Sequence, residues 1–286
     1  MLVASATAYA WFVRTQIRAV FQEKTALQAR GIAFLLTQEV MKALKLLSKK
    51  SDSLHDPWFQ PMFIPLQDFG VANVSLKPLD NKIPLKYLFA SKNNRNSDID
   101  TGLKIVWPNM WLELGERGIS LPAKVLDYID VDTVPRAGGR DGPDNLNRDL
   151  FDISELLGIP EITPELLYGE PPTKRGLADY CTLWSGKQIN INTVEPHVLA
   201  LFENMNWNTV EDVMKYRAEK EITNIADLKR EIPSFPNLQN TMFIIGYTSD
   251  YYNLKIQLLD ENWNSTRYFD IVLLKSEGRI LRWEEM

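Results

Sequence analysis

The sequence predicts an α+β fold in which a long N-terminal helix packs on an antiparallel sheet that is interrupted by an inserted all-helical domain. The first 48 residues follow one helical pattern, residues 104–240 hold a series of short helix signals, and the chain after residue 241 alternates between apolar and polar positions. Strand signals on both sides of a helical block indicate an insertion, because each set of strands needs a partner face to cover.

The N-terminal segment is expected to form a single helix from about residue 3 to residue 48. It contains no proline and only one glycine, Gly31. Its apolar residues recur at helical spacing, at Phe21, Leu27, Ala33, Phe34, Val40, Leu44 and Leu47. The first 13 residues carry no charge, whereas a membrane span needs about 20 apolar residues. This gradient predicts a helix that starts partly within a membrane and then docks on a domain. A wholly soluble helix is the alternative.

Residues 49–103 are expected to form the first part of the β domain. A polar linker is followed by two runs with strand character, at 70–78 and 83–89. The turn residues Asp80 and Asn81 lie between them, so the two runs predict a hairpin.

The inserted helical domain is expected to span residues 104–240. Its clearest helix signal has Thr163 as the N-cap, Pro164 at the first helical position and Gly169 at the end. Short helices with short connections predict a small bundle. Residues 241–286 then hold four apolar-polar alternating runs, which predict C-terminal antiparallel strands that complete the β domain.

Composition narrows the class of function. The net charge of -5 and pI near 5.3 give no bulk attraction to nucleic acid. Cys181 is the sole cysteine, and His55 and His197 are the only histidines. This scarcity weakens both a zinc hydrolase and a Ser-His-Asp enzyme. No phosphate-binding loop or nucleophile motif is present, so we expect a protein that is not an enzyme.

An acidic segment at residues 126–149 is the main candidate site. Asp127 and Asp130 are spaced to share one helix face, and Asp132 follows just beyond the helix end. The glycine pair at 138 and 139 is followed by more side chains with oxygen atoms that could bind a cation, namely Asp141, Asp144, Asn145 and Asn147. Oxygen ligands without soft donors favour Ca²⁺ over zinc.

Two alternatives stay open for this segment. Three arginines, Arg136, Arg140 and Arg148, could satisfy the carboxylates by ion pairs alone. A hydrolytic carboxylate pair such as Asp130 and Asp144 would instead need a deep cleft between the two groups.

A second segment, residues 190–231, has the plan of a helix-hairpin-helix DNA-binding module. Two helices are expected there, the second capped by Asn208 or Thr209 and carrying Arg217. The hairpin lacks the glycines that allow a backbone N–H to approach a phosphate, and the segment is rich in acidic residues. A DNA-binding protein is therefore the alternative function, and we expect no nucleic-acid partner.

The chain resembles the K-type minor pseudopilins of type II secretion systems over essentially its whole length. The segments that carry the resemblance occur in the family's order: QEKTALQARGIAFLLTQEVMKAL, VSLKPLDNKIPLKYL, VLDYIDVDTVPRAGGRDG, DISELLGIPEITPELL and INTVEPHVLALF. A long helix on an antiparallel sheet is the pilin-like plan. Members of the family begin with a basic leader, which a prepilin peptidase removes, and a full apolar span. Met1 falls inside that span.

The resemblance implies a structural subunit at the tip of the pseudopilus that supports pseudopilus assembly and protein export across the outer membrane. Its partners would be the I-type and J-type minor pseudopilins. The helix would lie in the bacterial inner membrane and the soluble domain in the periplasm. Calcium binding in the helical domain is also implied, with the candidate ligands Asp127, Asp130, Asp132, Asp141, Asp144 and Asn147.

Overall fold

The computed structural model describes residues 2–46, 50–67, 69–90, 98–260 and 265–286. The chain divides into two compact units, which are described separately. The first unit comprises residues 1–48, 60–76 and 253–286, and the second comprises residues 49–59 and 77–252. The domain limits expected from the sequence, at residues 48, 103 and 240, stay a prediction.

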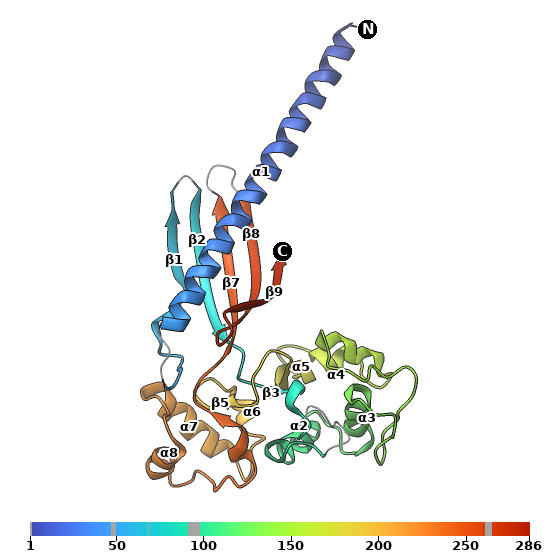
Figure 1. Cartoon of the computed structure of the whole chain (residues 1–286), viewed down its shortest axis with the longest axis vertical. Helices are drawn as coiled ribbons and strands as arrows, with labels where there is room; N and C mark the ends of the chain where they lie inside the picture. Colours follow the sequence, from blue (N-terminus) through green and yellow to red (C-terminus); the bar gives the residue numbers. More distant parts are fainter. Residues whose placement is uncertain (1, 47–49, 68, 91–97, 261–264) are drawn as a thin grey trace. The chain divides into compact units, whose positions relative to one another are not determined.

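The first unit combines one long helix with a five-stranded sheet, as the sequence predicts (Figure 1). The sheet order is β1-β2-β7-β8-β9, with β1 antiparallel to β2 and β8 antiparallel to β9. The elements are α1 (Leu2–Leu46), β1 (Met62–Leu66), β2 (Gly70–Pro78), β7 (Tyr251–Asp260), β8 (Ser265–Leu274) and β9 (Arg279–Glu285). The predicted helix end at residue 48 lies outside the described residues. Among the described residues, no helix is long and apolar enough to cross a membrane.

Small side chains form much of the buried face of α1. Ala29, Ala33 and Thr37 are fully buried at a spacing of four residues, and Met41 and Leu44 continue the same face. Small residues let a helix backbone lie close to its neighbours. Among the apolar residues that recur at helical spacing, Ala33 and Leu44 belong to this buried face, whereas Phe21, Leu27 and Phe34 are exposed.

Strand β1 was not expected from the sequence. Pro65 lies inside it, and a proline argues against a central strand because it has no N–H to donate. The sheet order places β1 at an edge, where a proline is tolerated.

The predicted hairpin between residues 70–78 and 83–89 is wrong. Strand β3 (Ile83–Pro84) pairs in parallel with β4 (Cys181–Thr182), not with β2. The cause is the turn residue Asp80, which is only 2% exposed. Its carboxylate accepts backbone N–H groups from Gly186 at 2.6 Å and from Tyr251 at 2.8 Å, so the chain is held to distant segments.

The second unit is built mainly from short helices, and its buried core includes Trp107, Trp111 and Phe202. The helices are α2 (Val106–Glu113), α3 (Ser120–Ile129), α4 (Pro164–Tyr168), α5 (Leu177–Tyr180), α6 (Pro196–Leu199), α7 (Trp207–Glu219) and α8 (Ile225–Glu231). Strand β5 (Ile189–Asn190) pairs in parallel with β6 (Ile245–Gly246). The first of the four predicted C-terminal strands therefore lies in this unit and not in the large sheet.

Local capping signals hold well in this unit. The Thr163 hydroxyl accepts the Leu166 N–H at 3.2 Å, and Gly169 ends α4 with a φ of +74°. Helix α7 is capped by Asn206, whose side chain accepts the Thr209 N–H at 3.0 Å, so the expected cap at Asn208 or Thr209 was wrong by two to three residues.

Candidate metal centre

Helix α3 brings two aspartates to one buried face. Asp127 lies in its last turn, and Asp130 is the C-cap, where the backbone turns to an extended conformation. Both side chains are fully buried, which confirms that the spacing of three residues places them together. Burying two carboxylates is costly unless each oxygen has a partner.

The loop that follows α3 folds back onto the helix end. The Asn147 N–H donates to the Tyr128 carbonyl at 3.2 Å. The Asn145 side-chain nitrogen lies within hydrogen-bond distance of three acceptors, namely the Asp127 carbonyl at 3.1 Å, the Arg140 carbonyl at 3.0 Å and Asp141 Oδ1 at 2.9 Å. Asn145 therefore organises the loop through its nitrogen.

Three of the predicted ligands converge at this point. One carboxylate oxygen from each of Asp130, Asp132 and Asp141 lies within 4.8 Å of the others. Among the described residues, Asp130 Oδ1, Asp141 Oδ2 and Asn147 Oδ1 are buried and have no hydrogen-bond partner. A buried acceptor without a partner costs free energy, so these oxygens suit a cation.

The inner side of the cluster is held by Arg136. Its Nη1 donates to Asp127 Oδ1 at 2.9 Å and also contacts Asp130 Oδ2, and its backbone N–H lies 3.1 Å from Asp127 Oδ2. The guanidinium carbon lies 5.2 Å from the centre of the Phe89 ring. The sequence left two interpretations open, and each applies to different oxygens of the cluster. Arg136 pairs with Asp127 and with Asp130 Oδ2, whereas Asp130 Oδ1 and Asp141 Oδ2 remain for a cation.

Burial raises the pKa of Asp130 to about 6. Hydrogen bonding to Arg136 opposes this rise, while the charges of Asp132 and Asp127 add to it. The carboxylate is therefore poorly compensated by the groups around it.

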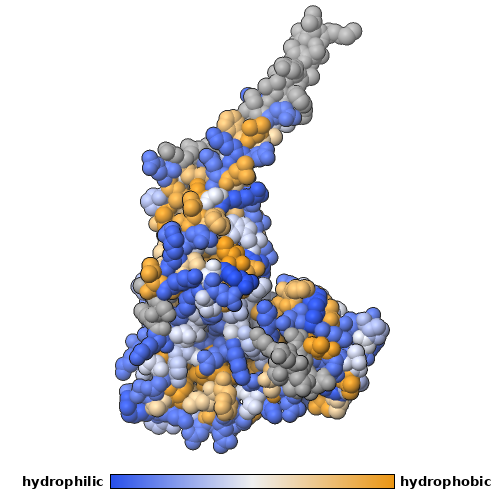
Figure 2. All heavy atoms as spheres, in the orientation of Figure 1, coloured by the Kyte–Doolittle hydropathy of each residue, from blue (hydrophilic) through white to orange (hydrophobic). Residues whose placement is uncertain are grey.

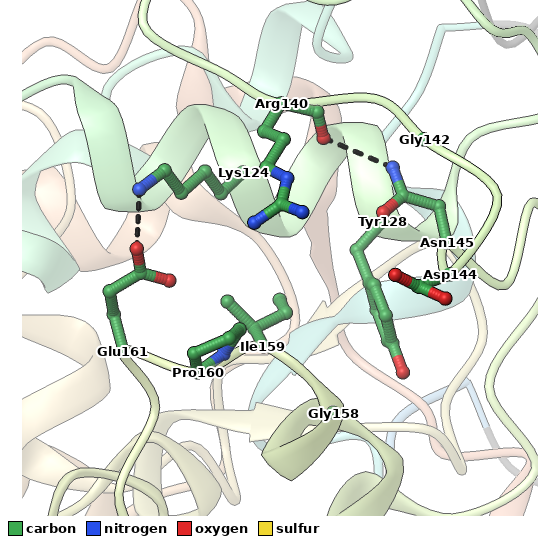
Figure 3. A pocket seen from close by; sticks show the side chains of 10 residues that line it. All are labelled: Lys124, Tyr128, Arg140, Gly142, Asp144, Asn145, Gly158, Ile159, Pro160 and Glu161. Atoms are coloured by element: carbon green, nitrogen blue, oxygen red, sulfur yellow. Dashed lines mark hydrogen bonds and ion pairs between the residues drawn. The ribbon is translucent and has the colours of Figure 1, made fainter.

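Asp144 is not one of the three carboxylates that converge. It lines a small cavity of about 90 Å³ together with Lys124, Tyr128, Arg140 and Glu161 (Figure 3). Lys124 is paired there with Glu161 at 2.5 Å. The third arginine, Arg148, pairs with Glu155 at 2.7 Å and not with the acidic cluster.

The residues present fit calcium. The convergent donors are carboxylate oxygens, a class of ligand that a hard divalent cation prefers. Cys181 is buried beside Met110, with 3.3 Å between the two sulfurs, and burial raises its pKa. His197 contacts the Tyr180 ring and the Asp179 carbonyl. The sole cysteine and His197 are therefore engaged in other contacts.

The helix-hairpin-helix segment turns its key polar residues inward. Arg217 Nη1 donates to the Val194 carbonyl at 2.5 Å, within the segment itself. Asn192 bonds both backbone groups of Ile222, and Asn190 donates to the Asp52 carbonyl and to Ser249. These contacts hold the helix pair to its surroundings, as expected for turn and packing residues.

Comparison with known proteins identifies the fold. No family model and no curated protein matches the sequence. Among solved structures, a chain in the crystal structure of the GspK-GspI-GspJ complex from the enterotoxigenic Escherichia coli type 2 secretion system matches with a TM-score of 0.62. The match has 15% sequence identity and covers 95% of this chain and 99% of that chain. The chain has the fold of a pseudopilin. The resemblance to the K-type minor pseudopilins is thereby confirmed at the level of the fold.

Sequence reasoning did not single out two residues that shape this centre. Arg136 was one of three available arginines, and its separation of nine residues from Asp127 follows no helical period. Gly139 stood out only as one member of a glycine pair. A Cβ at this position would lie 1.9 Å from Asp127 Oδ2, so glycine is required by the close approach of the carboxylate.

Proposed function

We propose that the protein is a K-type minor pseudopilin, a structural subunit of the tip of the type II secretion pseudopilus. The observation that carries this proposal is the match to the GspK-GspI-GspJ complex over nearly the full length of both chains. A helix on a sheet alone would be a weak argument, whereas the match also includes the helical insertion. In this role the chain assembles with I-type and J-type subunits and supports protein export across the outer membrane.

The exposed side of α1 supplies a surface for such partners. Leu27 and Leu35 are 60% and 65% exposed, and apolar side chains lie among polar ones along this helix (Figure 2). Exposed apolar residues in a row on a helix are suited to packing against another helix. In the proposed assembly the start of α1 lies in the inner membrane and the remainder faces the periplasm.

The partner proposal is tested by co-expression with the I-type and J-type minor pseudopilins of the same organism. We expect co-purification and co-elution on gel filtration. Leu27→Glu together with Leu35→Glu should abolish co-elution because each introduces a charge on an apolar contact. Gln28→Glu adds one negative charge at an exposed polar position next to Leu27 and should leave assembly intact. A chain that elutes alone when both partners are present would contradict the proposal.

We further propose that calcium binds at Asp130, Asp132 and Asp141, with Asn147 as a further oxygen donor. Bound calcium would supply positive charge to oxygens that otherwise lack partners. The chain's own contribution is to hold these oxygens on α3 and its return loop. The test is thermal melting of the full chain in calcium and in chelator, with elemental analysis. An unchanged midpoint and no retained metal would reject this part of the proposal.

A further inference from the structure

The acidic cluster of Asp127, Asp130, Asp132 and Asp141 includes one positive charge, that of Arg136. Asp127 and Asp130 are fully buried, and Nη1 of Arg136 lies between them. Both oxygens of Asp127 lie within hydrogen-bond distance of the Arg136 backbone N–H, at 3.2 and 3.1 Å. Asp127 is therefore neutralised by the chain itself and presents no unpaired oxygen to the cluster.

Asp130 joins the two halves of the cluster. Its Oδ2 contacts Arg136, whereas its Oδ1 is buried without a partner among the described residues. Asp132 and Asp141 lie on the open side, with oxygens within 4.8 Å of Asp130. One carboxylate is thus shared between a fixed guanidinium and an open oxygen set.

Charge decides how many cations this arrangement accepts. The four carboxylates of Asp127, Asp130, Asp132 and Asp141 would repel one another, most strongly at the two that are fully buried, Asp127 and Asp130. Arg136 cancels one negative charge, and one divalent ion would reduce the remaining three to one. A second divalent ion would have to displace the guanidinium from two buried carboxylates and from its contact with Phe89.

We infer that Arg136 is a built-in counter-cation that occupies the inner half of the cluster, so that the centre takes a single divalent ion and keeps Asp127 out of the coordination shell. This inference rests on the proposed calcium binding. Arg136 is a positioning residue: it orients Asp130 and holds the loop to α3 before any ion arrives.

The test compares Arg136→Gln with Arg140→Gln in the full chain. Arg140 is on the same loop and is exposed, and the substitution removes the same charge. In chelator, Arg136→Gln should lower the melting midpoint by about 5 °C more than Arg140→Gln, because it leaves two buried carboxylates uncompensated. Calcium should then raise the midpoint of Arg136→Gln more than that of the wild type. Equal midpoints for the two variants in chelator would overturn the inference.

Calorimetric titration with calcium chloride gives the second readout. The wild type should bind one ion per chain, and Arg136→Gln should bind calcium about tenfold more tightly or take up a second ion, because a nearby positive charge has been removed. Asp127→Asn should change the affinity little, whereas Asp130→Asn should abolish binding. A folded Arg136→Gln variant that no longer binds calcium, or two ions per wild-type chain, would overturn the inference.

A double variant covers the case in which Arg136→Gln does not fold. Asp127→Asn with Arg136→Gln removes both members of the buried pair, so its midpoint in chelator should recover toward the wild type. No recovery would reject the pairing. If the wild type binds no calcium, the proposed calcium site fails, while the chelator comparison of Arg136→Gln with Arg140→Gln still decides the role of Arg136.

Discussion

Two buried aspartates of the second unit, Asp80 and Asp130, differ in how their oxygens are used. Asp80 Oδ1 accepts from the Gly186 N–H and the Ser185 hydroxyl, and its Oδ2 accepts from the N–H groups of Asp250 and Tyr251. Asp130 has one oxygen on Arg136 and one without a partner in the described chain. Burial raises the pKa of both carboxyls. Saturation by fixed donors suits a structural acid, whereas an open buried oxygen leaves a position that a cation could occupy.

The largest expected effect is at the saturated acid. Asp80→Ala should lower the free energy of unfolding by about 3 kcal/mol, because it leaves buried backbone N–H groups without an acceptor. Calcium should not restore the loss. Urea unfolding in calcium and in chelator measures both effects, and Asp98→Ala, at a well-exposed aspartate, should cost at most about 0.5 kcal/mol. A calcium-dependent loss at Asp80 would break the distinction between the two acids.

The open acid should show the opposite behaviour. Asp130→Asn should remove the stabilisation that calcium gives the wild type, which is about 2.7 kcal/mol at an ion concentration of 100 times Kd. The matched control is Asp144→Asn, which should leave the calcium response intact because Asp144 is not among the converging carboxylates. Chemical unfolding with and without calcium separates them. Equal responses in the two variants would remove Asp130 from the site.

Substituting Gly139, where the loop lies close to Asp127, should reduce stability by a smaller amount. Gly139→Ala places a Cβ 1.9 Å from Asp127 Oδ2 and should cost about 2 kcal/mol, since the loop or the carboxylate must shift. Gly142→Ala meets no atom within 4 Å and should change stability by no more than about 0.5 kcal/mol. If both substitutions are tolerated alike, the loop is not held against Asp127.

The smallest expected effect is at the loop organiser. Asn145→Ala removes the amide that bridges the Asp127 carbonyl, the Arg140 carbonyl and Asp141, and should cost about 1 kcal/mol. Calcium affinity should also fall several-fold, because Asp141 loses its orientation. The control is Asn208→Ala, at an exposed position of α7, and titration calorimetry provides the measurement. An unchanged affinity in Asn145→Ala would show that Asp141 is positioned by other contacts.

The sequence predicts local features of the fold well and pairings between distant segments poorly. Thr163, Pro164 and Gly169 mark the limits of α4 correctly because capping depends on neighbouring residues. Asp80 has the composition of a turn residue, yet its partners lie more than 100 residues away in sequence. Whether such an aspartate lies in an exposed hairpin turn or is buried and bonded to distant segments depends on long-range contacts.

The candidate site shows the same division. The spacing of Asp127 and Asp130 predicts one shared helix face, and the structure confirms it. The return of Asp141 rather than Asp144 to that face depends on the path of an irregular loop, which no periodicity encodes. The Asn145 side-chain nitrogen lies close to three acceptors along that path, and side-chain composition alone does not reveal these contacts.

By itself, the sequence determined the class of fold, the hard-oxygen character of the acidic segment and the scarcity of soft ligands, because these follow from residue type and short-range spacing. The tertiary structure alone decided which arginine neutralises which aspartate, which buried oxygens stay without a partner, and which face of α1 is covered. These outcomes depend on how distant segments pack and on which donors reach each buried oxygen, since a buried carboxylate is stabilised only by groups brought within hydrogen-bond distance.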